Sequence, residues 1–156
     1  TGHLVLSTLH TNDAPSTLNR LLNMGVAPFN IAASVLLITA QRLVRKLCEN
    51  CKTPTEYPRE ALLKAGFRED ELDDTWKPYK AVGCSSCNNG YRGRLGIYQA
   101  MPISDEIERL IITQGTVAEI AAQAQREGVR DLRQSGLVKV ALGATTLEEV
   151  ISATNE

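Results

Sequence analysis

The placement of the four cysteines constrains this chain most, because all of them lie in two CxxC pairs. Cys48 and Cys51 belong to KLCENCK, and Cys84 and Cys87 belong to GCSSCNNG. The turn within such a pair points both sulfurs the same way, so two pairs can complete a tetrahedron around one zinc ion. The spacing therefore predicts a zinc site with four thiolate ligands. Because four protein ligands leave no position for water, we expect this zinc to be structural and not catalytic.

Disulfides and redox catalysis are the two alternatives for these cysteines. Disulfides suit secreted chains, which are usually smaller and richer in cysteine, and TGHLVLSTLH has neither a basic leader nor a small-residue cleavage pattern. Redox chemistry would need only one CxxC, beside a thioredoxin-like βαβ pattern that the sequence lacks. The stretch between the pairs is polar and is expected to have little core of its own, so zinc would supply its stability.

The composition indicates a folded protein without a nucleic-acid partner. A chain of 156 residues with 43% hydrophobic content can bury a core. The formal net charge is -1, and acidic runs such as REDELDD offset the basic residues. The electrostatic field of the protein would therefore not attract the phosphate backbone of a nucleic acid. The longest apolar stretch, residues 31–40, is too short to cross a bilayer and is expected to be a buried helix. The first residue is not methionine, which indicates a fragment of a longer protein.

The first part of the chain predicts one strand and two helices. Residues 3–10, HLVLSTLH, are expected to form a strand buried on both faces of a mostly parallel sheet. Asp13 can cap a following helix that Gly25 ends. A second helix is expected to start near Pro28 and to run to the first cysteine, because apolar residues recur there at roughly helical spacing.

The later residues predict a short helix at REALLKAG, a strand at residues 95–99 and then helices to the end. Apolar stripes on these last helices are expected to form core. Three helix starts are marked by capping residues, namely Ser104, Thr116 with Glu119, and Thr146 with Glu149.

Four stretches of the chain resemble one known family. TGHLVLSTLHTNDA is similar to the histidine box of the secretion and pilus motor ATPases, and QRLVRKLC, GYRGRLGIY and GATTLEEVISATNE resemble the same proteins in the same order. The paired CxxC motifs are similar to those of the type II secretion and type IV pilus assembly branches, whereas the pilus retraction branch lacks them. The tail and the cysteines together favour pilus assembly. Two departures are Gln99, where glutamate is common, and the turn CNNGY, which is one residue shorter than in many relatives.

The resemblance implies a fold for the longer protein, an α/β RecA-like P-loop ATPase domain. This chain would be its C-terminal fragment, with the end of the RecA-like core and the histidine box at residues 1–47. An inserted tetracysteine zinc module would follow at 48–99, and a helical C-terminal bundle at 100–156. The Walker A and Walker B segments of the family are not among these residues. We therefore expect no ATP hydrolysis by the fragment alone.

The resemblance also implies a function for the whole protein. A cytoplasmic homo-hexamer, binding ATP and Mg²⁺, would hydrolyse ATP to power type IV pilus assembly. It would act on an inner-membrane platform protein and lie at that membrane through its partners, with no transmembrane segment and no nucleic acid. The type II secretion ATPase is the related alternative. From another class, the alternative is a freestanding structural-zinc interaction module, which would have no need of a strand end rich in threonine and histidine.

Three residues are predicted to bind nucleotide. Ligands of parallel α/β sheets gather at the carboxyl ends of the strands, where Thr8 and His10 are expected. His10 is the predicted catalytic residue, because an imidazole donor there could sense the terminal phosphate, and the family resemblance supports this role. Arg94 lies between glycines in GYRGRLG, and its planar guanidinium suits phosphate, as the resemblance also implies. Arg42 and Arg92 are expected to be solvated or to form salt bridges.

Overall fold

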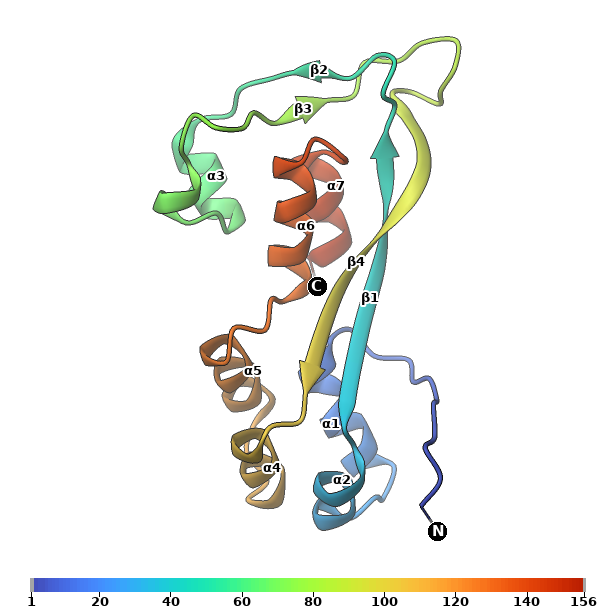
Figure 1. Ribbon diagram of the computed structural model, residues 1–156, viewed down its shortest axis with the longest axis vertical. Coiled ribbons are helices and arrows are strands. Elements are labelled where there is room, and N and C mark those ends of the chain that lie inside the picture. Colours follow the sequence, from blue (N-terminus) through green and yellow to red (C-terminus); the bar gives the residue numbers. More distant parts are fainter. Residues whose placement is uncertain (1, 156) are drawn as a thin grey trace. The chain divides into compact units, whose positions relative to one another are not determined.

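The computed structural model describes residues 2–155 as a mixed α/β protein (Figure 1). The chain divides into two compact units. One consists of Thr1–Ala40 with Ala100–Val129, and the other of Gln41–Gln99 with Arg130–Glu156. The predicted division at residues 47 and 99 is a different partition and stays a prediction. Within the described range, none of the helices combines the length and the apolarity needed to span a membrane.

The first unit is built on four helices whose starts carry side-chain caps or a proline. They are α1 (Ala14–Asn23), α2 (Pro28–Ser34), α4 (Asp105–Ile112) and α5 (Val117–Arg126). The Asp13 carboxylate accepts the Ser16 N–H at 2.8 Å, which confirms the predicted cap of α1. The caps at Ser104 and Thr116 are confirmed as well. The helices enclose an apolar core that includes Leu18, Ile31, Ile107, Ile111 and Ile120.

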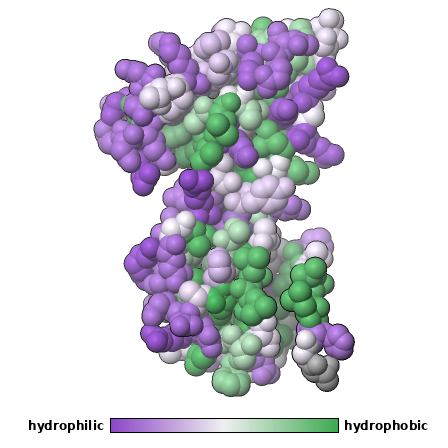
Figure 2. All heavy atoms as spheres, in the orientation of Figure 1, coloured by the Kyte–Doolittle hydropathy of each residue, from purple (hydrophilic) through white to green (hydrophobic). Residues whose placement is uncertain are grey.

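The predicted strand at residues 3–10 is wrong for this structure. That segment has no regular secondary structure, and Leu4, Val5 and Leu6 are 78%, 76% and 89% exposed. Figure 2 shows it as apolar surface at the lower right. A strand buried on both faces needs a strand on each side. None of the strands in the described part of the chain pairs with these residues.

The predicted second helix is correct only as far as Ser34. The chain then continues as β1 (Leu37–Leu47), which pairs with β4 (Tyr91–Pro102), a longer strand than predicted. The Cys48 N–H donates to the Gly90 carbonyl at 2.9 Å, and the Ile103 N–H donates to the Leu36 carbonyl at 3.0 Å. These bonds join opposite ends of the two strands, so the pair is antiparallel. Residues 37–47 form a strand because β4 is present to pair with them, although the spacing of their apolar residues suggested a helix.

The second unit also contains the loop between the cysteine pairs and the last two helices. A short antiparallel pair, β2 (Thr53–Pro54) and β3 (Tyr79–Lys80), leads to and from α3 (Arg59–Ala65) and a 3-10 turn, η1 (Glu69–Glu71). The final helices are α6 (Leu132–Ala141) and α7 (Leu147–Thr154). The predicted helices at REALLKAG and after Thr146 are thereby confirmed.

The cysteine loop forms no separate core but shares one with α6 and α7, so apolar packing adds to the stability that a metal would supply. Its contribution comes from α3 and from Phe67, whose ring stacks on Trp76 with centroids 4.9 Å apart. The helices approach each other closely at Gly136, where a Cβ would lie 2.4 Å from Val150 Cγ1. The buried residues of this core are Leu62, Ala65, Phe67, Leu137, Val140, Leu147 and Val150.

Candidate metal centre

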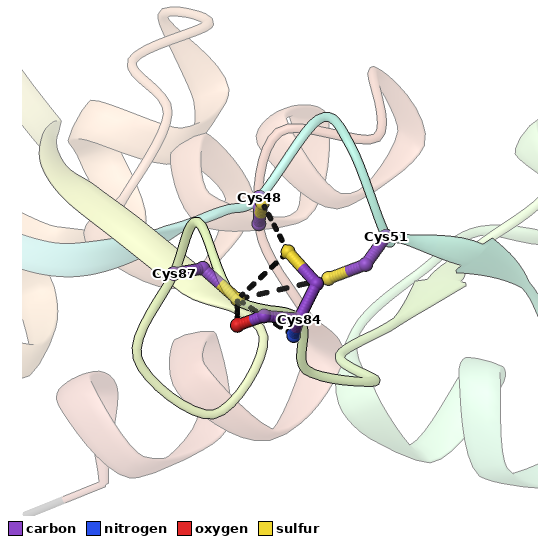
Figure 3. Close-up of side chains that lie close together, drawn as sticks. All are labelled: Cys48, Cys51, Cys84 and Cys87. Carbon is purple, nitrogen blue, oxygen red and sulfur yellow. Dashed lines mark hydrogen bonds between the residues drawn. The ribbon is translucent and has the colours of Figure 1, made fainter.

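The four cysteine sulfurs converge on one point of the second unit (Figure 3). All four Sγ atoms lie within 4.8 Å of one another. Cys48 and Cys84 are 3.8 Å apart, Cys51 and Cys87 are 3.8 Å apart, and Cys84 and Cys87 are 3.6 Å apart. Sulfurs bound tetrahedrally at about 2.3 Å from zinc lie about 3.8 Å from each other. The cluster therefore has the size of a site that could bind a metal such as zinc, and its cysteines are free thiols.

Local turns bring the sulfurs of each pair together. The N–H of the second cysteine donates to the carbonyl of the first at 3.4 Å in both pairs. After the second pair, Asn88 and Tyr91 exchange two backbone hydrogen bonds across Asn89 and Gly90, whose φ angles are 52° and 92°. Two central residues with positive φ form a type I′ turn, the tightest hairpin connection. This turn explains how the short sequence CNNGY enters β4 directly.

Backbone donors and neighbouring thiols set the proton affinity of the cluster. The Gly83 N–H donates to Cys51 Sγ at 3.4 Å, and the Cys84 N–H donates to Cys87 Sγ at 3.3 Å. Burial raises the pKa of Cys87, but the backbone N–H groups of Cys84 and Gly90 and the adjacent thiols outweigh it and lower the pKa to about 7. The Ser86 N–H lowers the pKa of Cys84, yet neighbouring thiols and burial raise it to about 11. Four such close thiols ionise together only when a cation neutralises them.

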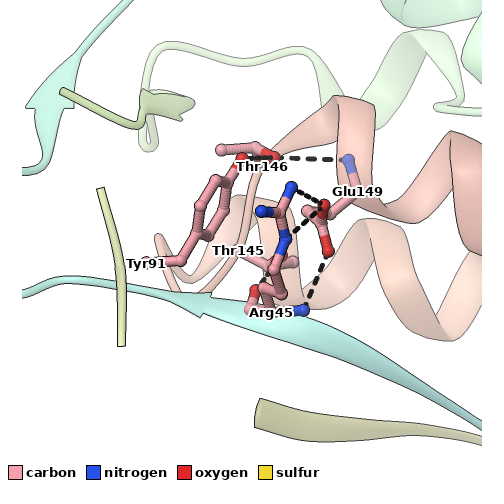
Figure 4. A network of polar contacts seen from close by, with 5 residues as sticks. All are labelled: Arg45, Tyr91, Thr145, Thr146 and Glu149. Atoms are coloured by element: carbon pink, nitrogen blue, oxygen red, sulfur yellow. Dashed lines mark hydrogen bonds and ion pairs between the residues drawn. The ribbon is translucent and has the colours of Figure 1, made fainter. Parts of the chain in front are cut away.

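An ion pair joins β1 to α7 near the cysteines (Figure 4). The Arg45 guanidinium donates to Glu149 Oε1 from Nε at 2.9 Å and from Nη2 at 2.6 Å, and the Arg45 backbone N–H donates to Oε2 at 2.9 Å. The hydrogen bond from Arg45 lowers the pKa of the Glu149 carboxyl. The Glu149 N–H donates to the Thr146 hydroxyl, which confirms Thr146 as the cap of α7. The Glu149 carboxylate, which was expected to bond back to the start of the helix, binds Arg45 instead.

Two threonines and a tyrosine complete this network. Thr145 is fully buried and its hydroxyl donates to the Arg45 carbonyl at 2.8 Å. The Tyr91 hydroxyl lies 2.9 Å from Thr146 Oγ1, and the Arg45 guanidinium lies 4.1 Å from the centre of the Tyr91 ring. Sequence reasoning did not single out Arg45, Tyr91 or Thr145. A signal was present, because a helix needs only one capping hydroxyl and GATTLEE supplies two.

The structure gathers the predicted metal ligands, whereas the predicted nucleotide-binding residues are divided between the two units. Thr8 and His10 are exposed in the segment without regular structure, which belongs to the first unit. Arg94 is exposed on β4, within the second unit. The end of the histidine-box segment is anchored to α1, because the hydroxyls of Thr11 and Thr17 lie 2.7 Å apart. The nucleotide-binding role of these residues stays a prediction.

Comparison with known proteins gives relatives across the whole chain. Residues 1–152 match the family described as Type II/IV secretion system protein. The chain is 55% identical over 156 residues to "Type IV pilus assembly ATPase PilB" of Pseudomonas aeruginosa, covering 100% of this chain and 27% of that protein. It is 53% identical to the protein of the same name from Myxococcus xanthus, covering 99% and 27%. It is 43% identical to "Type II secretion system protein HxcR" of Pseudomonas aeruginosa, covering 100% and 29%. The chain thus spans between a quarter and a third of the length of these relatives.

Proposed function

Because this chain belongs to the type II/IV secretion system protein family, we propose that it is part of a motor ATPase that powers type IV pilus assembly. The observation that carries the proposal is a comparison within one organism. In Pseudomonas aeruginosa the pilus assembly ATPase is 55% identical to this chain, and the type II secretion protein is 43% identical. The family match over residues 1–152 extends far beyond the cysteine loop, which favours a motor over a freestanding zinc module.

The whole protein would be a cytoplasmic homo-hexamer with a RecA-like core that binds ATP and Mg²⁺. It would act on an inner-membrane platform protein of the pilus machinery and lie at that membrane through this partner. Within it, residues 1–47 would end the core, 48–99 would form the zinc module and 100–156 the helical bundle. The exposed apolar side chains of Leu4, Val5 and Leu6 support this assignment, since further residues of a larger core would cover them.

The metal of the cysteine cluster would be a structural zinc held by Cys48, Cys51, Cys84 and Cys87. Their separations fit the tetrahedron, and four sulfur ligands leave no open coordination position. Bound zinc would contribute folding stability by linking the end of β1 to the start of β4. Thr8, His10 and Arg94 would contact the nucleotide in the whole protein, with His10 acting on the terminal phosphate. Their exposure leaves them accessible to such a ligand.

A chimera tests the pilus assignment against the secretion assignment. The matching segment of each of the two Pseudomonas aeruginosa relatives is replaced by this chain, and each chimera is expressed in a strain that lacks the corresponding parent protein. We expect the pilus chimera to restore surface pili, seen by electron microscopy, and the secretion chimera to leave export defective. Restored export without restored pili would contradict the proposal. Replacing each segment by its own unchanged sequence is the matched control.

A further inference from the structure

The segment at residues 143–149, which we name the clasp, holds the chain on both sides of the first CxxC pair. The Leu47 N–H, immediately before that pair, donates to the Ala144 carbonyl at 2.9 Å. The Lys52 ammonium, immediately after it, donates to the Gly143 carbonyl at 3.0 Å and lies 4.8 Å from the centre of the Tyr79 ring. Two clasp carbonyls thus hold the backbone of Leu47, just before the first CxxC pair, and the side chain of Lys52, just after it.

The clasp also holds the residues that follow the second pair. Tyr91, the first residue of β4, bonds through its hydroxyl to Thr146, and its ring supports the guanidinium of Arg45. That guanidinium in turn binds Glu149, whose side chain is 17% exposed. One short segment therefore contacts the flanks of both cysteine pairs, although its own residues contain no metal ligand. All of these contacts lie within the second unit.

We propose that the clasp is a positioning device for the cysteine cluster, which strengthens metal binding and is itself tightened by the metal. The inference rests on the proposed zinc site. Four sulfurs must reach one small tetrahedron, and ordering their flanks beforehand removes part of the entropy cost of binding. Coupling between two events is reciprocal, so the factor by which the clasp strengthens metal binding equals the factor by which metal strengthens clasp closure.

The zinc affinity of this chain and its variants tests the coupling. It is measured by letting each protein compete for zinc with a chelator that changes colour when it binds the metal. Glu149→Ala removes the ion pair and Tyr91→Phe removes one hydroxyl, and neither residue is a ligand. We expect each change to weaken zinc binding about fivefold or more, the lower end of measured couplings between sites. The matched control is Glu69→Ala, which removes the exposed Arg59–Glu69 ion pair from the loop between the two cysteine pairs and should leave zinc affinity unchanged.

Hydrogen exchange supplies the reciprocal measurement. Removing zinc from the parent chain with a chelator is expected to speed exchange of the Leu47 amide, which donates to the clasp, by about the factor found in the competition assay. Tyr91→Phe preserves the ring, so it keeps the test decisive if Glu149→Ala fails to fold. A parent chain that binds no zinc would refute the metal site and the clasp role together. Zinc binding that stays equal in Tyr91→Phe, Glu149→Ala and Glu69→Ala would refute the clasp role alone.

Discussion

Gly136→Ala is expected to destabilise the second unit, although alanine favours a helix more than glycine does. Gly136 lies in α6, where the added Cβ would meet Val150 Cγ1 at 2.4 Å, Cγ2 at 3.0 Å and Cβ at 3.3 Å. Rotating the valine cannot relieve all three contacts, because its Cβ does not move with the rotation. Overpacking of this kind costs about 1–3 kcal/mol, and the gain in helix propensity returns at most about 1 kcal/mol. We expect a net loss of about 1–2 kcal/mol in the free energy of unfolding.

The measurement is urea unfolding of the zinc-loaded chain, with a melting temperature lowered by about 3–6 °C as the thermal counterpart. Val150→Ala alone should cost about 2 kcal/mol, because Val150 is fully buried. In the double variant the new alanine occupies space that the valine methyls vacated. The double variant should therefore be more stable than the sum of the two single effects by about 1–2 kcal/mol. Additivity within about 0.5 kcal/mol would refute the packing argument.

Three further experiments probe the metal centre, the turn at Gly90 and the predicted nucleotide site. Elemental analysis should find about one zinc per chain, and Cys84→Ser should lose it; a folded parent with no metal and four titratable thiols would contradict this. Gly90→Ala should destabilise the chain by about 2 kcal/mol or more, since its φ is 92° and a Cβ would lie 2.5 Å from the Ala81 Cβ. Gly93→Ala is its control in urea unfolding, because φ there is 82° and nothing lies within 4 Å, so it should cost only about 1 kcal/mol; equal losses would exclude a steric role for Gly90. In an ATPase-competent pilus chimera, steady-state kinetics should show His10→Ala lowering kcat and Arg94→Ala mainly raising KM. Two variants with the kinetics and the assembly size of the parent chimera would place both residues outside the site.

Features set by a few neighbouring residues could be predicted from the sequence. The caps at Asp13, Ser104 and Thr116 depend on side chains within one turn of the helix start. The cysteine cluster could also be predicted from the sequence, because the spacing within each CxxC pair already implies a turn. The only further requirement was that the two pairs lie together, which is expected because one tetrahedral zinc takes two ligands from each pair.

Features set by distant partners could not be predicted in the same way. Ile31, Val35 and Ile38 recur at spacings of four and three residues, which suit one helix face, yet Ile38 lies in β1, so only pairing with β4 decides between helix and strand. Residues 3–10 have the composition of a buried strand, yet composition cannot supply the strands that would flank it. Arg45 and Glu149 are ordinary surface charges in the sequence, and their hydrogen bonds connect positions 104 residues apart.

The core that the cysteine loop shares with α6 and α7 also matters during protein synthesis. The Tyr57 hydroxyl donates to the Glu148 carboxylate, 91 residues later in the chain. At typical translation rates, the second partner leaves the ribosome about 5–20 s after the first. For most of that interval Leu62 and Phe67 lack the helices that cover them in the finished unit. Each nascent chain therefore passes through a period in which this apolar face is open to chaperones, proteases and other nascent chains.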